Sequence, residues 1–449
     1  MKPRSGRGWR AVFGAAALGC ALEGGPVRAA APEPAAAAAE GDAVGPRDLP
    51  VPAGAVVAGT FEELRALVED PGGPKAIALT AQVYRGDLVI KRPLSLTGRR
   101  GAVLEGTGGG TVVTVKASDV LVSDVLIRRS GHRNTTEDAG FKATGERVRI
   151  AHARLEDTLF GVSFEECKAC AVEGVSVLGF DEQTELRGDG IKLWESHHST
   201  VRHALVERVR DVVVWYTRHA TLEDVVVRGS RYGTHLMYAH DASVRRSRFE
   251  GNVVGIFVMY SGRMLLEQNV VAGARGAAGM GFGFKDSDAI TARGNWLVAN
   301  TSGLYLDNTP RTTAEPVVFE GNVIALNDVG LRLHSAEKGL SFRGNDLRQN
   351  ALVVEADGGG SALAVEFRGN HFSEYEGYDL NGDGVGDVPF EVKALSSDLT
   401  ESRPTLKFFQ GTAAIGLLDA VAHAVPLLAA RKLLVDPAPL VRPPDIHAP

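Results

Sequence analysis

The chain has 449 residues, is 44% hydrophobic and 23% charged, and carries a formal net charge of −6 at pH 7. This charge argues against a nucleic acid as the main partner, because such a partner calls for a basic face. Three cysteines are too few for a fold held together by many disulfides. Glycine is abundant, with 53 residues, but it has no period of three, which excludes a collagen-like triple helix.

The N-terminus, residues 1–29, has the pattern of an export signal. Several basic residues precede an apolar run over 11–22, which is too short to span a bilayer. Ala29 ends a small-residue cleavage site, so we expect a cleaved signal peptide and a periplasmic protein. A lipid anchor on Cys20 is the alternative. Residues 30–47 are rich in Ala, Pro and Glu and predict a flexible linker.

Residues 48–80 predict an N-terminal cap. Thr60 and Glu63 form a capping-box-like start for a short helix that ends at Pro71. A repeat architecture needs such a polar cover on its first coil.

Residues 81–375 contain a repeat of about 22 residues, a period that indicates a solenoid. The pattern glycine–apolar–any–apolar, with aspartate in one slot, starts at Gly161, Gly190, Asp211, Gly233, Gly255, Gly281, Gly303 and Gly330. Asparagines recur with the same spacing at Asn269, Asn295, Asn322, Asn345 and Asn370, and three residues before repeat glycines at Asn252, Asn300 and Asn327.

These repeats predict an all-β chain folded as a right-handed parallel β-helix with one coil per repeat. Each repeat contains short apolar runs rich in Val, Ile and Phe, broken by Gly, Asn and Asp, and none shows helical periodicity over ten residues. Glycine and asparagine tolerate the left-handed backbone of tight corners, and stacked asparagines can hydrogen-bond between coils. A leucine-rich repeat or a propeller fits the spacing less well.

Cys167 and Cys170 form a CxxC motif within one predicted coil. In an exported protein the pair could be a disulfide, two free thiols or a metal site. Without a βαβ context, nothing favours a thioredoxin-like role.

Alternation within each repeat predicts which side chains point out of the solenoid. The fourth and second residues after each repeat start give two outward columns: Trp194, Trp215, Met237, Met259, Lys285, Asp307 and His334, and Lys192, Val213, His235, Phe257, Gly283, Tyr305 and Arg332. Because adjacent coils lie about 4.8 Å apart, Trp194, Trp215, Met237, Phe257 and Met259 would form one apolar surface. Such a surface favours a partner or ligand, with cover by a loop or by the C-terminal helix as the alternative.

The same surface contains soft metal ligands. Met237 and Met259 lie on neighbouring coils, His235 lies beside one of them, and His240 follows at the next corner. Thioether plus imidazole suits Cu⁺, whereas methionine packing at an apolar interface is the alternative.

Residues 376–392 form an acidic loop with the pattern of a calcium site. Asp379, Asn381, Asp383 and Asp387 place oxygen ligands at loop positions 1, 3, 5 and 9, with glycine at the turn. The twelfth position is Phe390 rather than the usual bidentate glutamate, so a bound Ca²⁺ would need an acid from elsewhere. A turn stabilised by Asx and glycine residues is the alternative.

Residues 393–449 predict a C-terminal helix and an extended tail. Apolar residues recur at helical spacing over 411–425, but Asp419 and Pro426 argue against a membrane span. The helix could cover a coil or face a partner, and the proline-rich residues 435–449 would be extended.

Polysaccharide binding or processing is the alternative function for an exported β-helix. A lyase or epimerase would need a basic groove beside a proton-abstracting residue, and a hydrolase would need carboxylates on neighbouring coils. The outward columns contain only the isolated acids Glu165 and Asp307, so we do not expect an enzyme.

Taken together, these segments resemble the NosD family of periplasmic maturation proteins of nitrous oxide reductase. The matching segments, spread over roughly residues 50–443, are GDGIKLWESHHS (188–199), DVVVWYT (211–217), RYGTHLMYAHD (231–241), GIFVMYS (255–261), GMGFGFKDSD (279–288), GLYLDN (303–308), NDVGLRL (327–333), YDLNGDGVGDVPF (378–390) and LVDPAPLVRP (434–443). A single segment is weak evidence, because many β-helices share it, but the ordered series is specific.

The resemblance implies a non-enzymatic assembly factor. Proteins of this family act with an ABC-type transporter, which comprises a cytoplasmic ATPase and a membrane permease, in forming the copper–sulfide cluster of the reductase. A copper chaperone lipoprotein is a further partner. By this analogy the surface from Trp194 to Met259 could receive copper or dock the reductase, and the C-terminal helix and tail could engage the permease. The CxxC motif is outside the family pattern and receives no role from it.

Overall fold

The computed structural model describes residues 44–335, 338–357, 362–393, 404–409 and 432–449, and the single positions Thr412, Ala414, Leu417 and Val421. The predicted signal peptide, Cys20 and most of the predicted linker lie outside these residues. So does the helix predicted over 411–425, apart from the four single positions. Within the described part of the chain, no helix is long and apolar enough to cross a bilayer.

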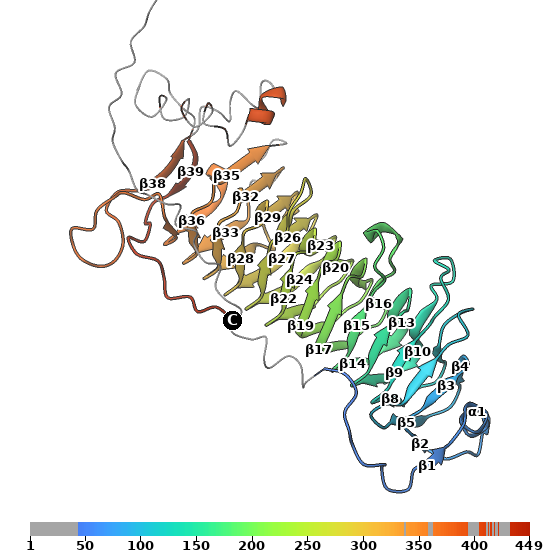
Figure 1. Ribbon diagram of the computed structural model, residues 1–449. Coiled ribbons are helices and arrows are strands. Elements are labelled where there is room, and N and C mark those ends of the chain that lie inside the picture. The colour runs from blue at the N-terminus through green and yellow to red at the C-terminus, as the bar shows by residue number, and fades with distance from the viewer. Residues whose placement is uncertain are drawn as a thin grey trace, which may run out of the picture. The chain divides into compact units, whose positions relative to one another are not determined.

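The described chain folds as a parallel β-helix, which confirms the predicted fold class (Figure 1). One face is a 12-stranded sheet in which every strand pairs in parallel with the equivalent strand of the next coil. Its strands are β4 (Leu88–Ile90), β7 (Val113–Val115), β10 (Ala139–Glu146), β13 (Phe160–Lys168), β16 (Ile191–Trp194), β18 (Asp211–Trp215), β20 (Tyr232–Met237), β23 (Val254–Met259), β26 (Met280–Lys285), β29 (Ser302–Asp307), β32 (Val329–His334) and β35 (Leu352–Asp357).

The other two faces belong to a 25-stranded sheet, because β17 (Thr200–Glu207) and β19 (Thr221–Arg228) run through both of them. The first of these faces contains β1 (Val56–Ala58), β2 (Ala76–Leu79), β5 (Leu94–Gly98), β8 (Val120–Ser123), β11 (Arg149–Ala151), β14 (Ala171–Glu173), β21 (Ser243–Arg245), β24 (Gly262–Glu267), β27 (Asp288–Arg293), β30 (Val317–Glu320), β33 (Leu340–Arg343) and β36 (Glu366–Arg368). The second contains β3 (Val83–Arg85), β6 (Val103–Glu105), β9 (Leu126–Arg128), β12 (Arg154–Glu156), β15 (Ser176–Leu178), β22 (Arg248–Glu250), β25 (Val270–Ala272), β28 (Trp296–Val298), β31 (Val323–Ala325), β34 (Asp346–Arg348) and β37 (His371–Phe372).

A ladder of buried asparagines runs along one corner of the solenoid, as their spacing predicts; its members are Asn269, Asn295, Asn322, Asn345 and Asn370. Oδ1 of Asn345 accepts hydrogen bonds from the backbone N–H and from Nδ2 of Asn322, both at 2.9 Å. Nδ2 of Asn345 also donates to the carbonyl of Phe319 at 3.0 Å. Asn345 thus satisfies a buried donor and a buried acceptor of the preceding coil, and its Nδ2 also donates to Oδ1 of Asn370 on the next coil at 2.8 Å.

A second, shorter ladder occupies another corner. Asn300, Asn327 and Asn350 repeat the same bonds, with the backbone N–H of Asn300 donating to Oδ1 of Asn327 at 2.9 Å. The two ladders hold adjacent coils at one fixed register.

Helix α1 (Phe61–Glu69) covers the N-terminal end of the stack (Figure 1). The predicted capping box is present, because Oγ1 of Thr60 accepts from the N–H of Glu63 and the Glu63 carboxylate accepts from the N–H of Gly59. Leu64 and Val68 bury the apolar side of the helix in the core. The solenoid begins within the segment expected to be only a cap, because β2 (Ala76–Leu79) already pairs in parallel with β5.

The C-terminal tail closes the other end. The last long strand, β39 (Lys432–Asp436), pairs antiparallel with β38 (Phe390–Lys393). Asp436 then occupies the next step of the asparagine ladder, since its Oδ2 accepts from the backbone N–H and Nδ2 of Asn370 at 3.0 and 2.9 Å. The predicted extended tail is thus bound to the last coil from Lys432 onward. Three 3₁₀ helices, η1 (Thr184–Leu186), η2 (Ala362–Ala364) and η3 (Pro404–Phe409), complete the described elements.

Replacing Asn345 by alanine should destabilise the solenoid by about 2–4 kcal/mol, because it leaves the buried N–H of Asn322 and the buried carbonyl of Phe319 without partners. Urea unfolding measures the change. Asn134→Ala is the matched control, since Asn134 is exposed and lies in a turn outside the ladder. Equal unfolding midpoints for the two variants would contradict a structural role of the ladder.

Candidate functional site

The outer face of the 12-stranded sheet carries the two predicted columns in register. Trp194 pairs with Trp215, Trp215 with Met237, and Met237 with Met259. Val213, His235 and Phe257 follow one another in the second column. Strand β20 contains one extra residue relative to β18, and this bulge places Tyr232 opposite Asp211 without disturbing either column.

His235 lies at the centre of this face, and only 8% of it is exposed. Its Nε2 is 3.3 Å from Sδ of Met259. The ring of Trp215 meets it edge-on with centroids 5.6 Å apart, and the rings of Tyr232 and Phe257 lie at 4.9 and 5.9 Å. These five residues, His235, Met259, Trp215, Tyr232 and Phe257, are called the His235 cluster below.

Two polar atoms in the His235 cluster are buried without a hydrogen-bond partner among the described residues. They are Nδ1 of His235 and Nε1 of Trp215. Burial lowers the pKa of His235 to about 4, so its imidazole is neutral at neutral pH. A neutral imidazole beside a thioether is the form that can bind a soft metal ion.

The structure brings together only some of the predicted copper ligands. Met237 lies between Trp215 and Met259 in one column. His240 lies at the following corner, where it pairs with Arg218 and Gly262, and is outside the His235 cluster. The described residues contain no group of three or more His, Cys, Asp or Glu side chains placed to hold a metal. The thioether–imidazole pair is therefore the candidate soft-metal site.

The sequence did not indicate that Gly283 leaves space for the ring of Phe257. A Cβ at Gly283 would lie 2.5 Å from the ring of Phe257 and 3.2 Å from Sδ of Met280. The ring therefore lies over Gly283 on the next coil. Tyr232, whose ring stacks on Phe257, was also missed because the bulge in β20 hides it from a fixed count.

Two buried acids lie on neighbouring coils outside the outward columns, in which the sequence shows only Glu165 and Asp307. Asp189 precedes β16, and Asp211 begins β18. Burial raises the pKa of Asp189 to about 6, and Asp211 is fully buried. Arg210 binds Asp189 at 3.0 Å, and Arg231 binds both oxygens of Asp211. These acids are held by arginines away from solvent, which does not suit acid–base work on a polysaccharide.

Cys167 and Cys170 form a disulfide. Both residues are buried, so the bond is closed off from solvent. Of the three possibilities left open by the sequence, the structure shows the disulfide.

The four predicted calcium ligands lie in one exposed loop. The Asp379 carboxylate accepts hydrogen bonds from the N–H groups of Gly382 and Gly384 at 2.7 and 2.8 Å. These bonds lower the pKa of Asp379, and the bond from Gly384 has the largest effect. Asp387 accepts from the N–H of Leu380 at 2.7 Å, and Asn381 Oδ1 accepts from that of Asp383 at 3.0 Å. These bonds are those of the Asx-stabilised turn. Calcium binding by the loop stays a prediction.

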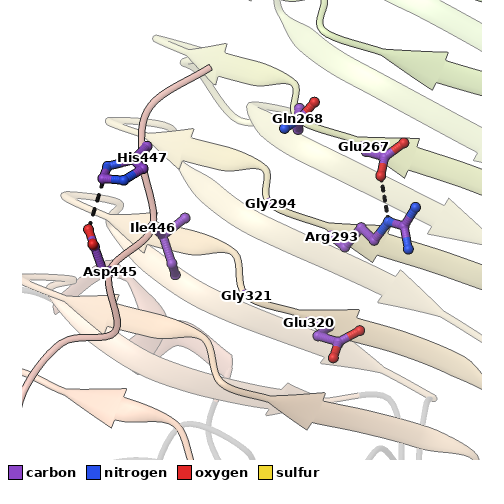
Figure 2. Close-up of a pocket in the computed structure, with 9 residues that line it drawn as sticks. All are labelled: Glu267, Gln268, Arg293, Gly294, Glu320, Gly321, Asp445, Ile446 and His447. Atoms are coloured by element: carbon purple, nitrogen blue, oxygen red, sulfur yellow. Dashed lines mark hydrogen bonds and ion pairs between the residues drawn. The ribbon is translucent and has the colours of Figure 1, made fainter.

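A pocket of about 400 Å³ lies where the tail passes over a corner of the solenoid (Figure 2). The tail residues Asp445, Ile446 and His447 face the turns at Gln268, Gly294 and Gly321. Glu267 and Arg293 in its wall pair at 2.6 Å. Asp445 and His447 are 87% exposed, so the pocket lacks the buried polar atoms found in the His235 cluster.

His235 and Asp189 should give opposite pH dependences of stability. Between pH 4 and 6.5 the unfolded chain binds a proton at His235 that the folded chain does not, so stability rises with pH. Between pH 3.8 and 6 the folded chain keeps a proton on Asp189 that the unfolded chain has lost, so stability falls with pH. Each contribution is on the order of 3 kcal/mol.

Relative to the unmodified protein, His235→Gln should therefore lose stability as pH rises from 4 to 6, and Asp189→Asn should gain it. Urea unfolding at a series of pH values measures both differences. Asp445→Asn is the control, because Asp445 is exposed. Difference curves that are flat for both variants would contradict the assigned pKa directions.

Comparison with known proteins shows which proteins the chain is similar to. Residues 175–377 match the model of a family described as periplasmic copper-binding protein (NosD). A probable ABC transporter binding protein NosD of Stutzerimonas stutzeri is 24% identical over 387 residues, which cover 82% of this chain and 87% of the relative. Its counterpart from Pseudomonas aeruginosa PAO1 is 26% identical over 399 residues, with 82% and 88% covered.

Among solved structures, the catalytic unit of the GH87 α-1,3-glucanase from Streptomyces thermodiastaticus strain HF3-3 resembles the chain with a TM-score of 0.50. It is 13% identical, and the match covers 74% of this chain and 67% of that one. This likeness concerns the β-helix fold alone. Over residues 175–377 the chain is thus similar to the NosD family of periplasmic copper-binding proteins, and over most of its length it is similar to the two relatives.

Proposed function

We propose that this protein is a periplasmic accessory factor in assembly of the copper–sulfide cluster of nitrous oxide reductase, and that the His235 cluster receives Cu⁺ as cargo. The contact of 3.3 Å between Nε2 of His235 and Sδ of Met259 carries the proposal. The description of the family as copper-binding supports it.

The chemistry of the His235 cluster suits Cu⁺ in particular. Thioether and neutral imidazole are soft or borderline ligands, and Cu⁺ accepts low coordination numbers better than the harder divalent ions. Met237, next to Met259 in the column, offers a second thioether.

The site also suits release of its cargo. A metal-binding histidine normally donates its other ring N–H to a carboxylate or carbonyl, which raises its basicity. Nδ1 of His235 has no such partner among the described residues. The imidazole is therefore a weaker ligand than a supported one, and its orientation is set by packing against Tyr232 and Phe257.

We assign the protein no enzymatic activity. Asp189 and Asp211 are buried and bound by arginines. Glu165 and Glu137 on the outer face are paired with Lys142 and Lys192. The polysaccharide alternative therefore rests on the fold alone.

The proposed partners are an ABC-type transporter with its membrane permease and ATPase, nitrous oxide reductase, and a copper chaperone lipoprotein. The names of the two relatives, ABC transporter binding proteins, support the transporter. The segment after the last coil, which includes the helix predicted over 411–425, is the proposed contact with the permease. Residues 432–436 are less suitable for this role, because they are already paired with β38.

Met259→Leu and His235→Gln should each lower the affinity for Cu⁺ by about tenfold or more, because each removes one ligand from a site of two or three. Anaerobic competition with the chelator bathocuproine disulfonate measures the affinity. Met264→Leu is the matched control, since Met264 is buried in the core. If the double variant keeps the stoichiometry and affinity of the unmodified protein, the assigned copper site is wrong.

In a strain that lacks this chain, the reductase should be produced without its copper–sulfide cluster. Copper content and absorption spectra of the purified reductase are the measurements. The unmodified gene should restore the cluster, and the His235→Gln, Met259→Leu gene should restore it poorly. A reductase that acquires the full cluster without this chain would overturn the proposed function.

A further inference from the structure

We propose that the stacked tyrosines Tyr216, Tyr238 and Tyr260 form a docking strip for arginine side chains of a partner protein. These residues are called the tyrosine strip below. The inference deepens the proposed function, because it places a partner beside the His235 cluster, but its test uses no copper.

The tyrosine strip lies directly beside Trp215, Met237 and Met259, which flank the proposed copper site and are called the copper column below. Its three residues follow Trp215, Met237 and Met259 in the sequence and occupy the same corner position on three consecutive coils. The ring centroids are 5.0 Å apart between Tyr216 and Tyr238 and 5.1 Å apart between Tyr238 and Tyr260, and the rings are nearly parallel. Tyr216 and Tyr238 are 44% and 40% exposed.

The backbone of the tyrosine strip is in the left-handed region, with φ of 51°, 51° and 49°. A side chain with a Cβ pays roughly 1–2 kcal/mol for this conformation, and glycine adopts it freely, as Gly294 and Gly321 do at another corner. Stacking of the rings offsets only part of this free-energy cost. Three bulky rings at successive positions of this kind, two of them exposed, point to a role in binding.

Carboxylates bracket the tyrosine strip along the same corner. Glu195 precedes Tyr216 by one coil, as shown by its N–H donating to the carbonyl of Trp215 at 3.1 Å. Asp286 follows Tyr260 by one coil, since the N–H of Tyr260 donates to the carbonyl of Lys285 at 3.0 Å. Arg218, the nearest basic residue along the chain, belongs to the next column, in which it pairs with His240.

This arrangement fits an arginine in particular. Inside the stack each ring covers its neighbour, so the outer faces of Tyr216 and Tyr260 are those left for a ligand. A guanidinium can lie flat on an aromatic face and present two N–H groups to a carboxylate, whereas an ammonium is a strongly hydrated point charge. Asp286 already accepts a hydrogen bond from Asn308, so the end formed by Tyr216 and Glu195 is the better site.

Glu195 and Asp286 also favour one class of partner for the tyrosine strip over the others. An anionic lipid surface or an acidic polysaccharide would be repelled by Glu195 and Asp286. A protein segment that presents arginine is attracted by the same charges. Because each tyrosine is joined to a residue of the copper column, a partner bound there lies next to the His235 cluster.

The test uses the full exported protein, free of copper, and a labelled Gly/Ser-rich peptide with two arginines. Its binding is compared with that of the same peptide carrying lysines. We expect the arginine peptide to bind about fivefold or more tightly than the lysine peptide. Tyr216→Leu should weaken binding about tenfold, Glu195→Gln about fivefold, and Tyr216→Phe little, because phenylalanine keeps the ring face.

Tyr378→Leu is the matched control, because Tyr378 is 56% exposed and lies in the acidic loop. Thermal unfolding of each variant checks that it is folded. Equal binding of the two peptides, or unchanged binding in Tyr216→Leu, would overturn the inference. So would binding of phosphatidylglycerol vesicles or of a neutral gluco-oligosaccharide in place of the arginine peptide.

The experiments distinguish a failure of this inference from a failure of the proposed function. Tyr216→Leu should keep its affinity for Cu⁺, since Tyr216 is outside the His235 cluster. Loss of arginine-peptide binding with unchanged copper affinity supports the tyrosine strip. A failed copper titration with intact peptide discrimination overturns only the copper site.

Discussion

Every functional feature of this chain depends on the register in which one coil hydrogen-bonds to the next. The asparagine ladder fixes that register, because each amide bonds to the backbone of the preceding coil and to the asparagine of the next one. A shift by one residue would turn every outward side chain inward. The ladder even extends to Asp436, which is 66 residues from Asn370 in the sequence. The tail is thus part of the structure that keeps the last coil aligned.

Fixed register makes distant residues into neighbours with a definite chemistry. His235 and Met259 are 24 residues apart, yet they are in contact because they lie on adjacent coils. Trp215 comes from the preceding coil, Tyr232 from the strand of His235 and Phe257 from the strand of Met259. Together these rings exclude water from the imidazole. That exclusion lowers the pKa of His235 and keeps its imidazole neutral. Coil stacking therefore determines both the position of His235 beside Met259 and the protonation state of the imidazole.

The sequence predicts those properties that repeat. The glycine spacing indicates the β-helix and its two outward columns, and these columns place His235 beside Met259. The features that the sequence does not predict lie where the repeat is interrupted. Tyr232 is displaced by a one-residue bulge, and Asp189 follows an insertion that breaks the spacing. The step from Asn370 to Asp436 crosses the end of the solenoid, where no period remains to indicate the partner.

The tyrosine strip was overlooked for a different reason. Its residues stand in the printed repeats as the pairs Trp215–Tyr216, Met237–Tyr238 and Met259–Tyr260, but alternation assigns outward directions only within a strand. At a corner the left-handed residue also points outward, so each coil presents two successive side chains instead of one. A soft ligand or ring and an exposed tyrosine can then lie side by side on three coils. A partner held by the tyrosines is consequently aligned with the copper column by the same register that builds both.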